Sequence, residues 1–293
     1  MLEAIRTFLC NLYDLIRYLL RFYRGKVAKP QGCCACPPAV KKPDPFLYSQ
    51  QYLMSLGQPV TWDNPDIFIF QNGVLVDPHD LHANTTYTVV ARIWNNSTDV
   101  PVVDMPVVLS YLSFGAATQS NPIGQTTVDL SVRGLPGCPA FAAMPWTTPA
   151  ALGHYCLQVL LRPPDDSNWL NNLGQRNTDV AQAHSPATFE FAVGNHGRKR
   201  VRDVSFTMDA YAIPPLQPCG EGLKPVSKIA PPVPNGWTVA LTPNTLTLAP
   251  DTEAVVQVAV TPPPGFTGAL PINIHSWDHG VLIGGVTLTV EAS

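Results

Sequence analysis

The residues with the clearest potential for chemistry lie in one acidic, amide-rich loop with the sequence PPDDSNWLNN. Carboxylate and amide oxygens are ligands that Ca²⁺ accepts, and this loop supplies them from Asp165, Asp166, Asn168, Asn171 and Asn172. The same residue types also dominate turns, because their side chains bond the local backbone. The spacing of an EF-hand is absent. A calcium loop and a structural turn are therefore alternatives, and we expect no other cofactor.

Two short motifs combine histidine with aspartate, DPHDLH at residues 77–82 and HSWDHG at residues 275–280. His79 and His82 would point to opposite sides of a strand, so neither motif brings a full ligand set onto one face. A nucleophile elbow of the G-x-S-x-G type, a phosphate loop and a G-x-G-x-x-G fingerprint are all absent. We expect the chain not to be an enzyme.

The chain has seven cysteines, and three of them form the cluster Cys33, Cys34 and Cys36. Their spacing is too tight for a zinc site and no histidine lies nearby. Disulfides between chains or solvated thiols fit better, and acylation is a further alternative beside an interfacial helix. Cys138 and Cys156 lie in one module, and whether they form a disulfide depends on the distance between them.

The cysteine cluster comes after a segment with strong helical periodicity, residues 1–25. One half of a helical wheel carries apolar side chains, among them Leu2, Ile5, Phe8, Leu9, Leu12, Leu15, Ile16, Leu19, Leu20 and Phe22. The other half carries Arg6, Asn11, Asp14 and Arg17, a pattern typical of an amphipathic helix. The charges interrupt any apolar run long enough for a membrane span or a signal peptide.

The apolar face of this helix must be buried against something, and three partners fit. It could fold onto its own body, pack in a partner's groove or against a second copy, or lie in a membrane interface. Residues 26–61 are rich in proline and cysteine and predict a linker that separates the helix from the strand-rich remainder of the chain. We therefore expect a homo-oligomer or a part of a larger assembly.

Composition bounds the chain as a whole. It has 293 residues, enough for two domains, with 45% apolar and only 13% charged residues. The 31 prolines favour short strands and loops over helices. A net charge of −3 provides no basic field for nucleic acid, and the cluster from Arg198 to Arg202 fits a solvated hairpin turn.

Strand-like alternation begins near residue 62, with inward positions such as Tyr87, Val89, Ala91 and Ile93 in TYTVVARIWN. Short strands separated by Asn-, Pro- and Gly-rich turns indicate sandwiches and no βαβ units. We predict a mainly β protein with two tandem immunoglobulin-like (Ig-like) sandwiches, at residues 62–184 and 185–293. We interpret residues 134–152 as a long insertion in the first of these sandwiches.

The first module resembles the bacterial CARDB-type Ig-like domains. The resemblance rests on a strand that ends at Asn95 and Asn96, a later strand that begins at Gly153 and Tyr155, and the loop that ends at Asn172. It implies an adhesion or scaffolding module. The second module is similar to small bacterial Ig-like modules that cap multidomain surface proteins.

We conclude from the sequence that the sandwiches form a rigid body and that the N-terminal helix anchors it to a macromolecular assembly or a membrane surface. Because no secretory signal is seen, a cytoplasmic, particle-bound or membrane-surface location is favoured over classical secretion. The alternative is a surface adhesin or glycan-binding protein with an aromatic platform at Trp146, Trp169 or Trp277.

Overall fold

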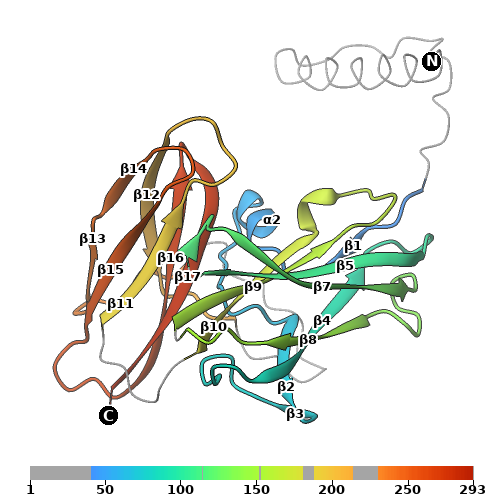
Figure 1. Ribbon diagram of the computed structural model, residues 1–293, viewed down its shortest axis with the longest axis horizontal. Helices are drawn as coiled ribbons and strands as arrows, with labels where there is room; N and C mark the ends of the chain where they lie inside the picture. The colour runs from blue at the N-terminus through green and yellow to red at the C-terminus, as the bar shows by residue number, and fades with distance from the viewer. Residues whose placement is uncertain (1–40, 114, 152, 181–187, 214–229, 293) are drawn as a thin grey trace, which may run out of the picture. The chain divides into compact units, whose positions relative to one another are not determined.

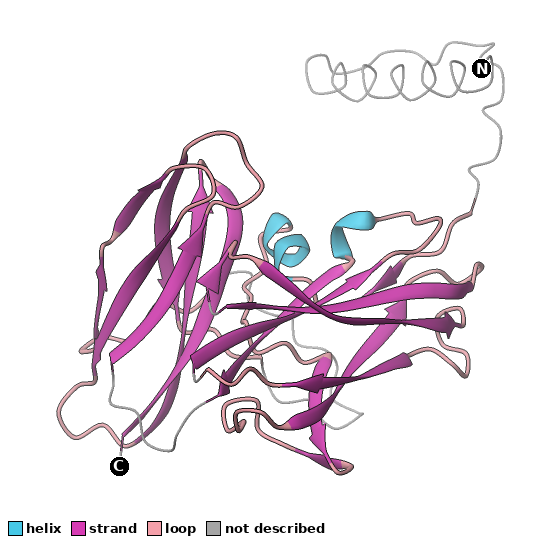
Figure 2. Ribbon diagram, in the orientation of Figure 1, coloured by secondary structure: helices cyan, strands magenta, loops and turns pink. Residues whose placement is uncertain are grey.

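A computed structural model describes residues 41–113, 115–151, 153–180, 188–213 and 230–292. The expected helix at residues 1–25 and the cysteine cluster lie outside these residues, so both stay predictions. Within the described residues the secondary structure is almost entirely β-strand (Figure 2). Residues 42–293 belong to one compact unit.

The first sandwich pairs two antiparallel sheets (Figure 1). In one sheet the central strand β4 pairs with β2 and β1 on one edge and with β8 on the other, and β3 pairs with β2. The other sheet has the order β10–β9–β5–β7. The strands are β1 (Pro45–Phe46), β2 (Ile67–Gln71), β3 (Val74–Leu75), β4 (Thr86–Asn95), β5 (Val102–Ser113), β7 (Ser120–Leu130), β8 (Ala140–Thr147), β9 (Gly153–Leu161) and β10 (Leu173–Val180).

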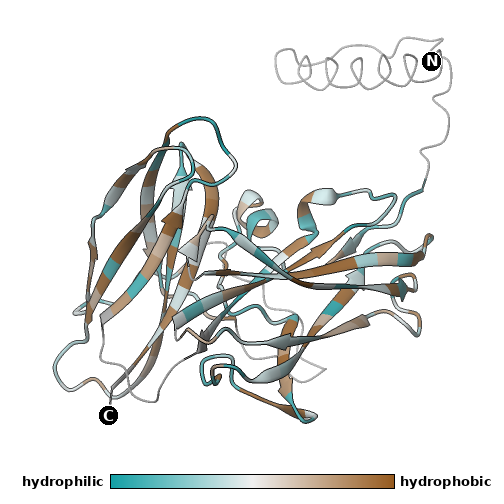
Figure 3. Cartoon of the chain, in the orientation of Figure 1, coloured by the Kyte–Doolittle hydropathy of each residue, from teal (hydrophilic) through white to brown (hydrophobic). Residues whose placement is uncertain are grey.

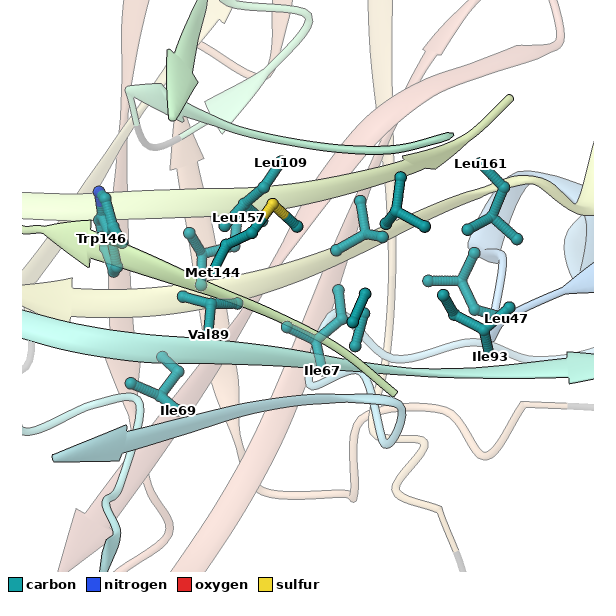
Figure 4. Close-up of a cluster of buried hydrophobic side chains, with 14 of the residues drawn as sticks. Leu47, Ile67, Ile69, Val89, Ile93, Leu109, Met144, Trp146, Leu157 and Leu161 are labelled. Carbon is teal, nitrogen blue, oxygen red and sulfur yellow. The ribbon is translucent and has the colours of Figure 1, made fainter. Parts of the chain in front are cut away.

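Alternation in the sequence explains which side of each sheet forms the core. Along β4 the side chains of Tyr87, Val89, Ala91 and Ile93 are buried, as predicted. They meet Leu109, Leu157 and other apolar side chains of the facing sheet (Figure 4). Figure 3 shows the resulting change between apolar and polar residues along the strands.

The structure corrects the interpretation of residues 134–152 as an insertion. This segment contains β8, which pairs with β4 along its whole length. Ala142, Met144 and Trp146 of β8 are buried in the core. The sequence hid this strand because Ala and Pro are poor strand formers, and Pro145 is tolerated there because β8 lies at a sheet edge.

The second sandwich also has two sheets. One contains β13–β15–β11, extended by the short strand β6 (Gly115–Ala116), and the other has the order β14–β12–β16–β17. The strands are β11 (Thr188–Gly194), β12 (Arg202–Asp209), β13 (Thr238–Thr242), β14 (Thr245–Leu248), β15 (Glu253–Thr261), β16 (Gly268–Asp278) and β17 (Val281–Ala292). The expectation that the basic cluster from Arg198 to Arg202 lies on a hairpin turn is wrong, because β11 and β12 lie in different sheets and the turn connects one sheet to the other.

Residues 42–61 fall in the segment that the sequence assigns to the linker, and here they pack on the first sandwich. β1 pairs with the end of β4, and the short helix α2 (Gln50–Ser55) begins after Ser49, whose side chain accepts a hydrogen bond from the Tyr52 amide. Leu47 and Val60 are buried. This part of the chain therefore belongs to the folded body.

Candidate functional site

The two sandwiches are joined by a short strand that the first sandwich adds to a sheet of the second. The connection from β5 to β7 in the first sandwich contains β6, which pairs in parallel with β11 of the second. A Cβ atom on Gly115 would lie 1.7 Å from the Ala192 carbonyl oxygen, at a φ of +148°. Only glycine allows this approach. Ala116 beside it is 0% exposed and belongs to the core of the second sandwich.

A tryptophan from the segment before β2 makes a second contact between the two sandwiches. We call this contact, together with the pairing of β6 with β11, the junction. Trp62 is fully buried, and its ring lies 6.3 Å from that of His275 on β16. Gly285 of β17 lies beneath it, where a Cβ atom would come within 2.4 Å of the indole Nε1. The close packing of an indole on a glycine leaves no room for the modules to slide at this point.

Polar side chains cross the junction next to Trp62. The Thr287 hydroxyl on β17 accepts a 2.8 Å hydrogen bond from the Trp62 amide and lies 3.2 Å from the Thr61 hydroxyl. Its own proton goes to Asn273 Oδ1 at 2.7 Å, so Thr61 is the donor to Thr287. All four residues are buried. The hydroxyl of Thr287 therefore links the two sandwiches through two hydrogen bonds and is held in place by a third within the second sandwich.

The chain of hydrogen bonds continues into the second sandwich. Asn273 Nδ2 donates to Asp209 Oδ1 at 2.7 Å, and His275 Nε2 lies 2.8 Å from Asp209 Oδ2. Burial raises the pKa of Asp209, but hydrogen bonds from His275, the Tyr211 amide and Asn273 outweigh it. The pKa of this carboxyl is therefore lower than usual, and Asp209 stays ionised beside His275.

The network also reaches the first sandwich. Gln50 on α2 donates to the carbonyls of Thr61 and Gln175, at 3.1 and 2.7 Å, and its Oε1 accepts from the Gln175 amide. Tyr48 accepts from the Thr61 amide, and burial raises the pKa of its hydroxyl. Residues 48–62 thus connect β10 of one sandwich to β17 of the other.

The proposed calcium loop has a different arrangement. Asp165 pairs with Lys42 at 2.6 Å. Asp166 accepts hydrogen bonds from the Asn168 amide and Asn172 Nδ2, and Asn171 Nδ2 donates to Asp44. The carboxylates of Asp165 and Asp166 are thus engaged by protein donors, whereas Oδ1 of Asn171 and Oδ1 of Asn172 are buried without a hydrogen-bond partner. Within the part of the chain described here, no group of three or more His, Cys, Asp or Glu residues could hold a metal ion.

The three candidate tryptophans differ sharply in exposure. Trp146 is buried and is therefore wrong as a binding platform. Trp277 is partly buried and donates to Thr207 at 2.8 Å. Trp169 lies in a short 3₁₀ turn (Trp169–Asn171) and is 75% exposed, and Leu170 beside it is 47% exposed.

The histidines and cysteines that the sequence analysis singled out lie in different parts of the structure. His79 lies 3.2 Å from Asp63, and His275 belongs to the junction. Cys138 and Cys156 are both free thiols, and burial raises the pKa of Cys156 to about 12.

The basic cluster is partly neutralised by one buried carboxylate. Asp278 Oδ2 is 3.1 Å from a guanidinium nitrogen of Arg198 and 3.6 Å from one of the buried Arg202.

Among the described residues, every helix is too short or too polar to span a membrane.

The described residues thus define a mainly β protein of two tandem β-sandwiches, each with its own apolar core. No protein-family description and no curated protein matches the chain. Alpha-2-macroglobulin of Escherichia coli, activated by porcine elastase, aligns with 77% of this chain and 22% of its own, at 11% identity and a TM-score of 0.24.

Two Yersinia pseudotuberculosis proteins also align. InvD matches 78% of this chain and 57% of its own, at 12% identity and a TM-score of 0.21. The adhesin InvE matches 73% and 57%, at 11% identity and 0.20. This chain therefore spans about a fifth of the macroglobulin and just over half of either Yersinia chain.

Proposed function

We propose that the chain is a non-enzymatic structural or adaptor protein whose two sandwiches act as one rigid body. The observation that carries the proposal is the junction between the modules. There the strand β6, a buried tryptophan and a continuous polar network connect the two sandwiches. Linked domains with small, polar interfaces normally move relative to one another. A buried junction of this kind suits a part that must hold two ends at a fixed separation.

In this proposal the amphipathic segment at residues 1–25 anchors the body to an assembly or a membrane surface. Light scattering on the full chain and on residues 42–293 tests it, because the latter contain both cores. We expect the full chain to assemble or bind vesicles and the shorter fragment to be an inert monomer. Two inert monomers would contradict the anchor.

A matched pair of double variants tests which face of the segment matters. Leu12→Asp with Ile16→Asp places two charges on the apolar face. Thr7→Asp with Asn11→Asp places the same charges, at the same spacing, on the polar face. We expect assembly or vesicle binding to be lost only in the first pair. Equal behaviour of both pairs would refute an amphipathic anchor.

The finer assignment of the first module to the CARDB-type domains belongs to the same proposal. Its support is the position of the motif residues: Asn95 closes β4, Gly153 begins β9, and Asn171 and Asn172 precede β10. The scaffolding role implied by that resemblance fits a rigid adaptor and a location on a particle or membrane surface.

An adhesin or glycan-binding role is the second candidate, favoured by the exposed indole of Trp169. Sugar rings stack on exposed aromatic faces because their C–H groups are attracted to the π surface. Saturable binding on a glycan array that is lost in Trp169→Ala, with Trp277→Ala as comparison, would support it. Absence of any such signal would leave the adaptor role alone.

A further inference from the structure

Trp169 and Leu170 form an exposed apolar pair, which we call the Trp169 knob. At 75% exposure Trp169 is the most exposed large apolar side chain among the described residues. Single exposed aliphatic residues are normal on protein surfaces, but tryptophan is buried on average. A protruding indole next to an exposed leucine therefore needs a physical explanation.

The backbone that carries the knob is held firmly. Asp166 accepts from the Asn168 amide at 2.9 Å and from Asn172 Nδ2 at 2.6 Å. The buried hydroxyl of Ser49 donates to the Leu170 carbonyl at 3.3 Å. The exposure of Trp169 is thus imposed by a fixed turn, and a fixed turn loses little conformational entropy when the side chain meets a partner.

The same loop is bonded to the residues at which the N-terminal segment joins the body. Lys42 Nζ pairs with Asp165 at 2.6 Å, and the Ser167 amide donates to the Pro43 carbonyl at 2.9 Å. Asp44 accepts from Asn171 Nδ2 at 2.8 Å. The knob therefore lies beside the point where residues 1–41 leave the body.

Charge near the knob is compatible with a largely zwitterionic surface. The carboxylate of Asp165 is paired with Lys42, whereas Asp166 and Asp44 accept hydrogen bonds from neutral amide groups and keep their negative charge. Indole rings favour the boundary between lipid headgroups and hydrocarbon, because one edge is polar and the rest apolar.

We propose that the Trp169 knob is a second lipid contact, which inserts the indole and Leu170 into the headgroup region of a bilayer. The proposal rests on the membrane form of the anchoring function above. If the amphipathic segment binds lipid, chain connectivity brings the Lys42 end of the body to the same surface. The local concentration of lipid at the knob then makes a weak second contact effective.

The experiment uses the full chain with vesicles of phosphatidylcholine and a minor fraction of phosphatidylserine. Trp169→Ser removes the indole, and Phe141→Ser removes an aromatic side chain that is 59% exposed on the strand β8. We expect the partition coefficient of Trp169→Ser to fall about tenfold, because an apolar side chain of this size contributes about a factor of ten or more on burial. Phe141→Ser should match the wild type.

Brominated lipids give a second measurement that does not depend on affinity. They should quench part of the tryptophan emission of the wild type, and this quenching should disappear in Trp169→Ser at saturating lipid. Both results together would support the knob as a lipid contact.

Three outcomes would overturn the proposal in distinguishable ways. If the wild type binds vesicles but Trp169→Ser binds equally well and quenching persists, the knob is not a lipid contact while the anchor stands. If the wild type does not bind vesicles at all, the membrane form of the anchor fails as well. A change in solution mass in Trp169→Ser without vesicle binding would instead assign the knob to a protein interface.

Discussion

The hydroxyl of Thr287 is the sharpest single test of the rigid body, because one atom makes three hydrogen bonds and two of them cross between the sandwiches. Thr287→Val keeps the shape of the side chain and replaces only this hydroxyl by a methyl group. The variant leaves the Trp62 amide and Asn273 Oδ1 buried without these partners. It leaves the strand pairing of β17 untouched.

The magnitude can be worked from the cost of burying polar groups. A buried amide without a hydrogen bond costs about 1–3 kcal/mol, and each other lost bond contributes about 0.5–1.5 kcal/mol. The added methyl group offsets part of this, so we expect the free energy of unfolding to fall by about 2–4 kcal/mol. For a folded body of this size that corresponds to a fall in melting temperature of about 5–15 °C.

Thermal and urea unfolding, followed by circular dichroism, measure the loss, and Thr289→Val provides the control. Thr289 lies two positions further along β17 and is exposed. Hydrogen exchange should also show faster exchange of the Trp62 amide and of the amides of β17 that surround Thr287. If the two valine variants differ by less than about 0.5 kcal/mol, the hydroxyl does not couple the modules, since surface substitutions vary by that much.

Three further predictions test other parts of the body. Gly285→Ala places a methyl group 2.4 Å from Trp62 Nε1, and we expect urea unfolding to show a loss of about 1–3 kcal/mol from overpacking. Because hydrogen bonds hold the pKa of Asp209 below its usual value, the ionised carboxylate stabilises the fold above the ordinary carboxyl pKa, and this is lost as pH falls through the lower folded value. Asp209→Asn should therefore be less stable than the wild type at neutral pH, and unfolding curves at several pH values should show the difference shrink in acid. Cys156, with its pKa raised to about 12, should resist iodoacetamide in the folded chain at mildly alkaline pH and react only after unfolding, as mass spectrometry can show.

Periodicity predicted the strands whose two faces differ in polarity. TYTVVARIWN alternates cleanly, and β4 occupies the predicted residues with the predicted side buried. The pattern weakens where the side chains on one face of a strand are small or where a proline interrupts the strand. For this reason the sequence AFAAMPWT predicts an insertion although it forms β8. Trp146 carried a usable signal, because every second residue before it is uncharged and small or apolar.

The junction was harder to predict because its residues look like surface residues. Asn171, Gln175 and Asn177 around β10 and Thr287 on β17 are polar, and in isolation a polar strand position predicts solvent. Here they are buried. Residues 48–62 bond to the backbone of Gln175 and Asn177 and to the Thr287 hydroxyl, while the side-chain amide of Asn177 has no hydrogen-bond partner. Which polar face is covered depends on contacts between segments more than 100 positions apart, such as Gln50 and Gln175.

The buried polar residues of the junction also affect how rigidly the two sandwiches are held. An apolar junction of the same area would tolerate small shifts, since hydrophobic contact has no preferred direction. Hydrogen bonds are directional, so the chain from Gln50 through Thr61, Thr287 and Asn273 to Asp209 fixes one relative orientation of the strands that it joins. A body that must present a surface at a defined angle to its anchor needs such an orientation. The polar residues whose types predict an exposed surface are thus the same residues that fix the orientation of the two sandwiches, as a rigid adaptor requires.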